Sequence, residues 1–142
     1  CYNEDTMGLF DLRMYDYIVD AMDTVSSKIL LIEQAGKYKV PVISCLSMGD
    51  KLDPSRLEIM DISRVAADSA TKKMRAELRK RGVRRLKVIC SREHSHRGFE
   101  FRKIKPSVEK NVQGSISFVA GVAGLMTAGE GVRGILAEKY KK

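Results

Sequence analysis

A chain of 142 residues with 44% hydrophobic residues has the size of one domain and enough apolar material for a core, which excludes a disordered tail. Its 26 lysine and arginine residues outnumber its 18 aspartate and glutamate residues, and the net charge of +8 favours a polyanionic partner. The longest apolar runs fall well short of the roughly 20 residues that a membrane-spanning helix needs, which excludes a transmembrane protein.

The cysteines and the amino terminus indicate a reduced compartment. Cys1, Cys45 and Cys90 form no CxxC pair, which argues against a disulfide framework and a cysteine zinc site. Cys45 and Cys90 lie in apolar runs, where a buried, inert thiol is the more common state. The first residues have neither the basic nor the apolar segment of a secretory signal. We therefore expect a cytoplasmic protein and, because the chain opens with cysteine, a processed or truncated piece.

The first third of the chain predicts a strand, a helix and a second strand. Residues 15–22 are β-branched and aromatic and predict a buried strand. Residues 24–37 have apolar residues at helical spacing, with Thr24 able to cap the start and Gly36 placed where a helix would stop. Residues 40–46 are a second apolar strand. This order is typical of a βαβ crossover, in which the two strands pair in parallel.

The middle of the chain continues the alternation of strands and helices. Residues 57–62 alternate apolar and polar side chains, as a half-exposed strand does. A cationic helix is expected over 70–81, ending at Gly82, and residues 86–91 predict another strand. The expected fold class is therefore α/β, with a mostly parallel or mixed sheet.

The last third predicts a loop, a strand and a helix. Residues 92–113 are basic with few apolar anchors, and we expect a long mobile loop there. Residues 115–119 predict a short strand, and residues 120–138, rich in glycine and alanine, predict a closely packed helix. No glycine-rich turn follows an amino-terminal strand, as it does in α/β nucleotide-binding domains, so we expect the sheet to be incomplete.

Two carboxylates stand where the first expected strand ends. Asp20 and Asp23 lie at the carboxyl edge of a parallel strand, the edge at which α/β sheets bind ligands. A carboxylate there would hold Mg²⁺ and position nucleotide phosphates, since Mg²⁺ takes few protein oxygens. The alternative is that Asp23 only caps the following helix. Lys28, one turn into that helix, would neutralise phosphate or remain in solvent.

The densest run of positive charge lies in the second expected helix and the turn after it. Between residues 72 and 87 there is one acid, Glu77, among nine basic residues: Lys72, Lys73, Arg75, Arg79, Lys80, Arg81, Arg84, Arg85 and Lys87. Like charges at helical spacing repel, so a polyanion such as nucleic acid is the favoured partner over a merely solvated face. Met74 and Leu78 are four residues apart and predict the core stripe of this helix.

Four separated segments together resemble a known family. They are residues 15–28 (YDYIVDAMDTVSSK), 49–56 (GDKLDPSR), 74–82 (MRAELRKRG) and 114–119 (GSISFV). Their order is similar to that in the tRNA threonylcarbamoyladenosine dehydratases of the ThiF/MoeB/HesA superfamily of adenylating enzymes. The resemblance implies that residues 1–142 form the carboxyl-terminal part of one Rossmann-like, ThiF-type adenylating domain.

The resemblance also implies an activity. Family members use ATP and Mg²⁺ to cyclise threonylcarbamoyladenosine at position 37 of tRNA, by adenylating its carboxylate and closing a ring with loss of water. By motif position, Asp23 would be the catalytic carboxylate that binds Mg²⁺ and ATP, with Lys28 as a second ATP contact. The tRNA would lie on the basic residues Lys72, Lys73, Arg75, Arg79, Lys80, Arg81, Arg84 and Arg85. A homodimer is expected, and a sulfur-relay partner is left open.

The chain departs from the family pattern in two places. The family's glycine-rich loop and the arginine and lysine that hold the ATP phosphates have no counterpart here, so we expect the isolated 142 residues to be inactive. Met48 and Asp50 stand where relatives more often have alanine and asparagine. Two alternatives stay open: an activator of a ubiquitin-like sulfur carrier protein, which would normally have paired CxxC motifs, and a non-catalytic RNA-binding module.

Overall fold

The chain forms one mixed four-stranded sheet. The computed structural model describes residues 2–66, 69–93 and 114–139. Its strands are β1 (Ile18–Asp20), β2 (Val42–Cys45), β3 (Leu57–Asp61) and β4 (Lys87–Ser91), in the spatial order β1-β2-β4-β3. β1, β2 and β4 run parallel, and β3 runs antiparallel to β4. The expected α/β class with a mixed sheet is confirmed, and so is the parallel βαβ unit at its start.

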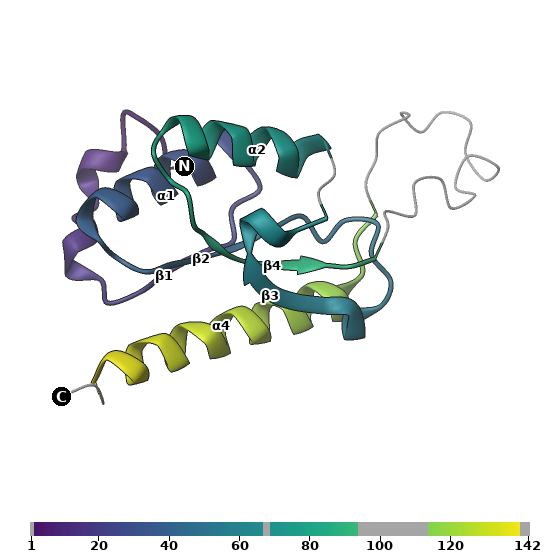
Figure 1. Cartoon of the computed structure of the whole chain (residues 1–142). Helices are drawn as coiled ribbons and strands as arrows, with labels where there is room; N and C mark the ends of the chain where they lie inside the picture. Colours follow the sequence, from purple (N-terminus) through teal and green to yellow (C-terminus); the bar gives the residue numbers. More distant parts are fainter. Residues whose placement is uncertain (1, 67–68, 94–113, 140–142) are drawn as a thin grey trace.

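Helices cover both faces of this sheet. The helix α1 (Val25–Tyr38) and the helix α2 (Ser69–Lys80) pack side by side on one face, and the long helix α4 (Ser117–Lys139) crosses the other (Figure 1). Four short 3₁₀ turns complete the described elements: Met7–Leu9, Leu12–Met14, Pro54–Arg56 and Ile62–Arg64. Where residues are described, no helix is both long enough and apolar enough to span a bilayer.

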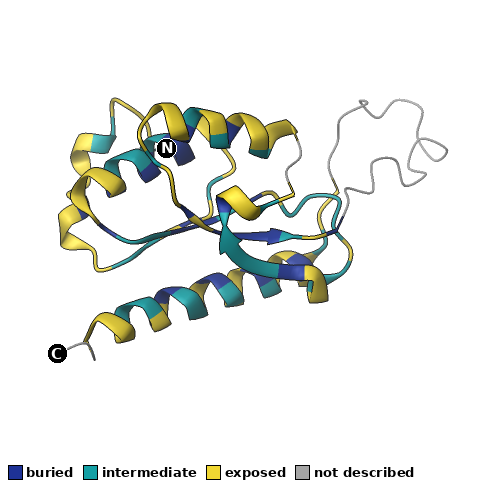
Figure 2. Cartoon of the chain, in the orientation of Figure 1, coloured by how far each residue is buried: buried dark blue, intermediate teal, exposed yellow. Residues whose placement is uncertain are grey.

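The two faces of the sheet have separate cores. Between the sheet and the helices α1 and α2, the core is built around Ile32, Leu78 and Val88, all at most 2% exposed. On the other face, Ile89 of β4 packs against Val119 of α4. Figure 2 shows these buried positions along the sheet and on the inward sides of the helices, with the outward side of α2 exposed. Met74 and Leu78 are buried as the helical spacing predicts.

The helix α1 does not stop at its glycine. Gly36 stays within the helix, and Lys39 takes the left-handed conformation that ends it (φ 59°), with its N–H directed at the carbonyls of Ala35 and Gly36. Ala35 is fully buried, so packing of the last turn holds the helix for two residues past the glycine. By contrast, Gly82 follows α2 with φ 82°, and it accounts for the end of that helix as expected.

The strand expected over residues 115–119 is wrong. Ser117 to Val119 form the first turn of α4, whose inward stripe is Val119, Ala123 and Thr127. A five-residue alternation is too short to separate a strand from the start of a helix, and the four-residue spacing of the buried stripe decides for the helix. The mobile loop expected over 92–113 lies outside the described residues except for Arg92 and Glu93, and Glu93 is buried.

Candidate functional site

The candidate site lies at the carboxyl edge of the parallel strands. The segments that follow β1, β2 and β4 all leave the sheet at this edge because the three strands share one direction. Asp20 is the last residue of β1, and the segment 21–24 leads from it into α1. The first two turns of α1 therefore bring Lys28 back over the strand end.

Asp20 is the centre of a buried polar cluster. Its carboxylate forms an ion pair with Lys28 (Nζ to Oδ2, 2.9 Å), and both side chains are almost fully buried. The hydroxyl of Ser44, on the neighbouring strand, donates to the same Oδ2 at 2.5 Å. The other oxygen, Oδ1, accepts the backbone N–H of Met22 at 3.0 Å, and Lys28 Nζ donates to the Met22 carbonyl at 2.8 Å. All of these donors and acceptors lie within eight residues of Asp20 except Ser44.

Lys28 is therefore not a solvated lysine. Its residue exposure is 5%, and its ammonium group lies inside the fold between a carboxylate and a carbonyl. The solvated alternative is wrong, and a direct contact between Lys28 and ATP stays a prediction. In the sequence, Lys28 lies eight positions after the strand-end Asp20 and one turn into the next helix, so their proximity was predictable, whereas their burial was not.

Asp23 has a different environment from Asp20. It is exposed, and within the described residues its carboxylate accepts no hydrogen bond and forms no ion pair. Thr24, not Asp23, occupies the cap position of α1, and no side chain closes that cap. The alternative in which Asp23 serves only as a helix cap is therefore wrong. An exposed, unpaired carboxylate at a strand's carboxyl edge is compatible with the predicted role of Asp23 as a Mg²⁺ ligand, which stays a prediction.

The residues present fit a magnesium ion that is shared with a nucleotide. Among the described residues, no group of three or more His, Cys, Asp or Glu side chains is close enough together to bind a metal ion. Mg²⁺ is usually held by one or two carboxylates together with substrate phosphates and water, so a single carboxylate such as Asp23 would fit this mode of binding. Asp20 is not available to the metal without breaking its bond to Lys28.

The surroundings of Cys45 and Cys90, near this edge, favour the neutral thiol. Burial raises the pKa of Cys45 above its ordinary value of 9.0; the charges of Asp20 and Asp23 add to the rise, and that of Lys28 opposes it. Burial also raises the pKa of Cys90. Cys90 is buried and Cys45 half-buried, which confirms the expected apolar setting, whereas Cys1 lies outside the described residues. A thiol with a raised pKa is a poor nucleophile at neutral pH.

Two loops are fastened beside the strand ends. The carboxylate of Glu93, after β4, accepts the backbone N–H groups of Leu52 (3.0 Å) and Asp53 (3.0 Å). Asp50 and Gly114 exchange two bonds, Asp50 N–H to the Gly114 carbonyl at 2.8 Å and Gly114 N–H to Asp50 Oδ1 at 2.9 Å. Asp50 is in the left-handed conformation (φ 56°), which aspartate and asparagine tolerate better than most residues. Replacing the family's asparagine with aspartate is therefore compatible with this turn.

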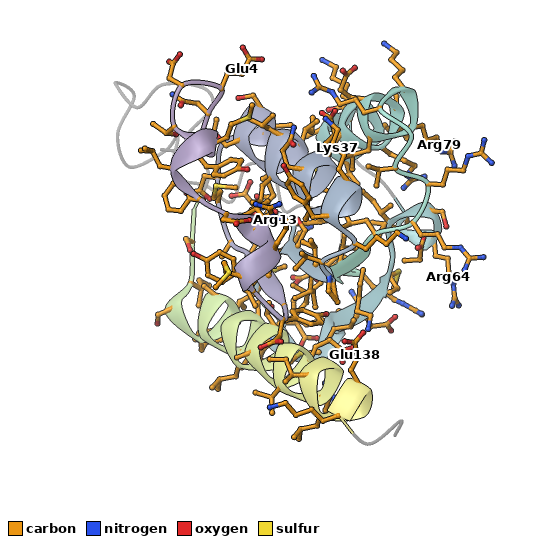
Figure 3. The ribbon with its side chains drawn as sticks, turned by 90° about the vertical axis from the view of Figure 1, so that its left-hand side faces the viewer. Glu4, Arg13, Lys37, Arg64, Arg79 and Glu138 are labelled. Atoms are coloured by element: carbon orange, nitrogen blue, oxygen red, sulfur yellow. The ribbon has the colours of Figure 1, made fainter. Side chains whose placement is uncertain are left out.

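The basic residues of α2 and of the turn after it differ in whether they bind other groups of the fold. Exposed side chains point outward from α2 and the turn after it: Lys72, Lys73, Arg79, Lys80, Arg84 and Arg85. Figure 3 shows Arg79 projecting away from the body on the same side as Arg64. Three predicted tRNA-binding residues have partners within the fold, and one of them, Lys80, forms only an exposed ion pair with Glu77 at 3.6 Å. Arg75 donates to the Val65 carbonyl at 2.8 Å, and Arg81 pairs with both Glu33 (2.9 Å) and Glu77 (3.1 Å).

A separate groove lies at the opposite, amino edge of the sheet. Its volume is about 550 Å³, and its walls are the end of α1, the starts of β2 and β4 and the end of β3. Arg85 and Lys39 line it, but Asp20, Asp23 and Lys28 do not. The predicted nucleotide edge and this groove are therefore at opposite ends of the strands.

Comparison with known proteins supports one relationship. No family model matches the chain. The chain is 34% identical over 147 residues to the tRNA threonylcarbamoyladenosine dehydratase of Bacillus subtilis, covering 96% of this chain and 57% of that protein. It is 40% identical over 78 residues to the Saccharomyces cerevisiae tRNA threonylcarbamoyladenosine dehydratase 1, covering 54% of this chain and 18% of that protein. The chain thus spans about half the length of the Bacillus relative.

Solved structures agree on the fold. The crystal structure of Escherichia coli tRNA N6-threonylcarbamoyladenosine dehydratase superposes with a TM-score of 0.82 at 18% identity, covering 99% of this chain and 56% of that chain. The same protein in complex with ATP superposes with a TM-score of 0.78 at 19% identity, covering 97% of this chain and 55% of that chain. The chain is thus homologous to the carboxyl-terminal part of the tRNA threonylcarbamoyladenosine dehydratases and has the ThiF-type α/β fold of that part.

Proposed function

We propose that this chain is the carboxyl-terminal part of an ATP-dependent tRNA threonylcarbamoyladenosine dehydratase. The observation that carries the proposal is the 34% identity with the Bacillus protein over nearly the whole chain. The carboxyl-edge geometry supports it, because the exposed Asp23 carboxylate stands where an α/β sheet binds nucleotides.

The proposed reaction activates a carboxylate and then displaces the activating group. The threonyl carboxylate of the modified nucleoside attacks the α-phosphorus of ATP and releases pyrophosphate. An intramolecular attack on the resulting acyl adenylate closes the ring and releases AMP, so that the nucleoside has lost one water. Adenylation converts a poor leaving group into a good one, and Mg²⁺, when bound, spreads the charge of the phosphates.

In this proposal Asp23 is the catalytic carboxylate that holds the magnesium ion and thereby the nucleotide. Its exposed, unpaired state supports this role. The open amino terminus of α1, with no side-chain cap, lies directly after it and favours negative charge. The glycine-rich loop of the family has no counterpart in the sequence, so the 142 residues by themselves are expected to lack activity.

The tRNA is proposed to lie across the outward face of α2. Lys72, Lys73, Arg79 and Lys80 are exposed on α2, and Arg84 and Arg85 are exposed on the turn after it; these side chains supply charge for the phosphate backbone. Arg75 and Arg81 contribute less to this surface, because their guanidinium groups are bound to Val65 and to two glutamates. We also propose that this activity takes place in the cytoplasm, where tRNA and ATP are both present.

We also propose that the protein is a homodimer that uses the outward face of α4. Phe118, Leu125, Val132 and Leu136 are 45–76% exposed on this helix, an unusual density of large apolar side chains on one surface. Their spacing of seven, seven and four residues places them along one side of the helix. Light scattering that gives a monomer mass would contradict the dimer. A sulfur-relay partner stays a prediction.

A chimera tests the proposed activity. This chain replaces the matched segment of the Bacillus dehydratase, and the product is incubated with threonylcarbamoyladenosine-containing tRNA, ATP and Mg²⁺. We expect mass spectrometry to find a nucleoside lighter by one water, and we expect Asp23→Asn in the chimera to abolish that product. A folded chimera that binds tRNA but leaves the nucleoside unchanged would contradict the proposal.

The same chimera separates the alternatives. A non-catalytic RNA-binding module would bind tRNA with a steep dependence on salt and no response to ATP. An activator of a carrier protein would exchange pyrophosphate into ATP only when a protein carboxyl terminus is supplied. Pyrophosphate exchange that depends on the modified tRNA is expected only of the dehydratase.

A further inference from the structure

We propose that Asp20 and Lys28 are positioning residues that bind the N–H and the carbonyl of Met22 and thereby set the direction of Asp23. The identity of the ligand that Asp23 binds, Mg²⁺–ATP, rests on the proposed function. The arrangement itself is a property of the fold and can be tested without a ligand.

Both backbone groups of Met22 are bound by the buried ion pair. Asp20 Oδ1 accepts the Met22 N–H at 3.0 Å, and Lys28 Nζ donates to the Met22 carbonyl at 2.8 Å. Lys28 is joined to Asp20 Oδ2 at 2.9 Å, so the three residues form a closed ring of polar contacts. Asp23 is the next residue along the chain, and its backbone N–H belongs to the peptide whose carbonyl Lys28 holds.

The pair is anchored to the rigid part of the molecule. Asp20 is the last residue of β1, and Ser44 of β2 fixes its second oxygen from the neighbouring strand at 2.5 Å. Lys28 extends from the second turn of α1. The segment 21–24 is thereby tied to the sheet on one side and to the helix on the other, although it has no regular structure of its own.

Stability alone does not account for this arrangement. A fully buried ion pair loses hydration on both partners and is often no more stabilising than apolar side chains of similar volume. Fixing the backbone beside a ligand-binding carboxylate has a separate benefit, because the ordering of that group is complete before the ligand arrives. Asp23 therefore loses less backbone freedom when it binds a ligand than a carboxylate on a free loop would.

Three variants separate positioning from stability. Lys28→Met leaves the Asp20 charge buried without its cation, and we expect Tm to fall by roughly 10 °C or more. The triple variant Asp20→Val, Lys28→Met, Ser44→Ala replaces the whole cluster with apolar side chains, and we expect Tm to recover most of that loss. Lys37→Met is the matched control: it removes a lysine of the same helix whose ion pair with Glu33 is at the surface, and its Tm should change little.

Amide hydrogen exchange in the whole 142-residue chain gives the decisive readout. In the unmodified chain we expect the Met22 amide to exchange at least about tenfold more slowly than an unbonded amide. In the folded triple variant this protection should be lost and the backbone order of residues 21–24 should fall, whereas Lys37→Met should change neither. A Met22 amide that is unprotected in the unmodified chain, or equally protected in the triple variant, would overturn the inference.

A second readout links the pair to nucleotide binding. In the chimera, calorimetry should show that the triple variant weakens Mg²⁺–ATP binding about tenfold, and that adding Asp23→Asn then weakens it little further, because the two changes act through the same group. Additive losses would overturn the link between the pair and Asp23. The two outcomes can also separate. If the triple variant loses the order of residues 21–24 but the unmodified chimera does not bind Mg²⁺–ATP, the positioning is supported and only the proposed function is overturned.

Discussion

The ring of Tyr17 lies against the backbone of Gly134, where a Cβ atom would stand 2.5 Å from Cε2 and 2.9 Å from Cδ2 of the tyrosine. Tyr17 directly precedes β1, and Gly134 is in the last third of α4. Gly131 is close to the same ring, with its Cβ position 3.6 Å from Tyr17 Cδ1. The glycines in this part of α4 therefore allow the helix to approach the first strand.

Gly134→Ala should destabilise the fold. The added methyl group would force the Tyr17 ring or the end of α4 to move, at about 1–3 kcal/mol. The matched control is Gly36→Ala in α1, where nothing lies within 4 Å and the exchange should stabilise by about 0.5–1 kcal/mol. Urea unfolding of both variants measures the two changes. Equal effects of the two substitutions would contradict the close contact.

The ion pair between Lys87 and Glu130 joins β4 to α4 and should make the docking of α4 depend on pH. The hydrogen bond from Lys87 lowers the pKa of Glu130 below its ordinary value of 4.5, and Glu130 raises the pKa of Lys87 above 10.5. The Glu130 contribution is present above pH 4.5 and is lost as pH falls through the lowered pKa. The Lys87 contribution is present below pH 10.5 and is lost as pH rises through the raised pKa.

Glu130→Gln should therefore destabilise the protein near neutral pH and have little effect in acid. The lysine side chain is 46% exposed, so solvent screening limits the expected change to about 0.2–1 kcal/mol. Glu138→Gln, an exposed change on the same helix, is the control (Figure 3). Denaturant titrations at several pH values measure the difference between the two variants. A difference that grows as pH falls below 4.5 would contradict the assigned signs.

Neutralising the outward face of α2 should weaken tRNA binding in a salt-dependent way. We expect glutamine at Lys72, Lys73, Arg79 and Lys80 to lower the slope of log affinity against log salt by roughly 0.7–0.9 for each lost phosphate contact. Arg133 and Lys139 lie on α4, across the sheet, and glutamine there serves as the control (Figure 1). Filter binding at several salt concentrations measures the slopes. Because the first set removes four charges and the control removes two, the losses are compared per charge, and equal losses per charge would show that net charge, and not this face, binds the tRNA.

Both described cysteines should be slow to alkylate in the native protein. Burial raises the pKa of both thiols, so little thiolate is present near pH 7.5. Cys45 is half-buried and should react before the buried Cys90. Mass spectrometry of iodoacetamide-treated Cys1→Ser protein measures both rates, and denaturant should make them equal. Native Cys45 reacting as fast as the denatured thiol would contradict its assignment as inert.

Much of the architecture is determined by local sequence pattern. Apolar β-branched runs around Ile18 and Ile43 and the helical spacing between them were sufficient to predict a parallel βαβ unit, because a helix that connects two such strands returns the chain in the same direction. The buried stripe of Met74 and Leu78 and the stop at Gly82 were predictable for the same local reason. The failure at Ser117–Val119 came where five residues fit either a strand or a helix turn, and only contact with Ile89 separates the two.

At the candidate site, too, the sequence predicted part of the arrangement and tertiary contacts decided the rest. From the sequence alone, Asp20 and Asp23 are two carboxylates at one strand end, and Lys28 is a cation nearby. The tertiary structure decided that Asp20 is buried and bound to Lys28 and that Asp23 is exposed. Ser44, distant in sequence on the neighbouring strand, donates to the same Asp20 oxygen that Lys28 contacts. Sequence determines which charges are adjacent along the chain, whereas burial depends on which strands and helices pack around each charge.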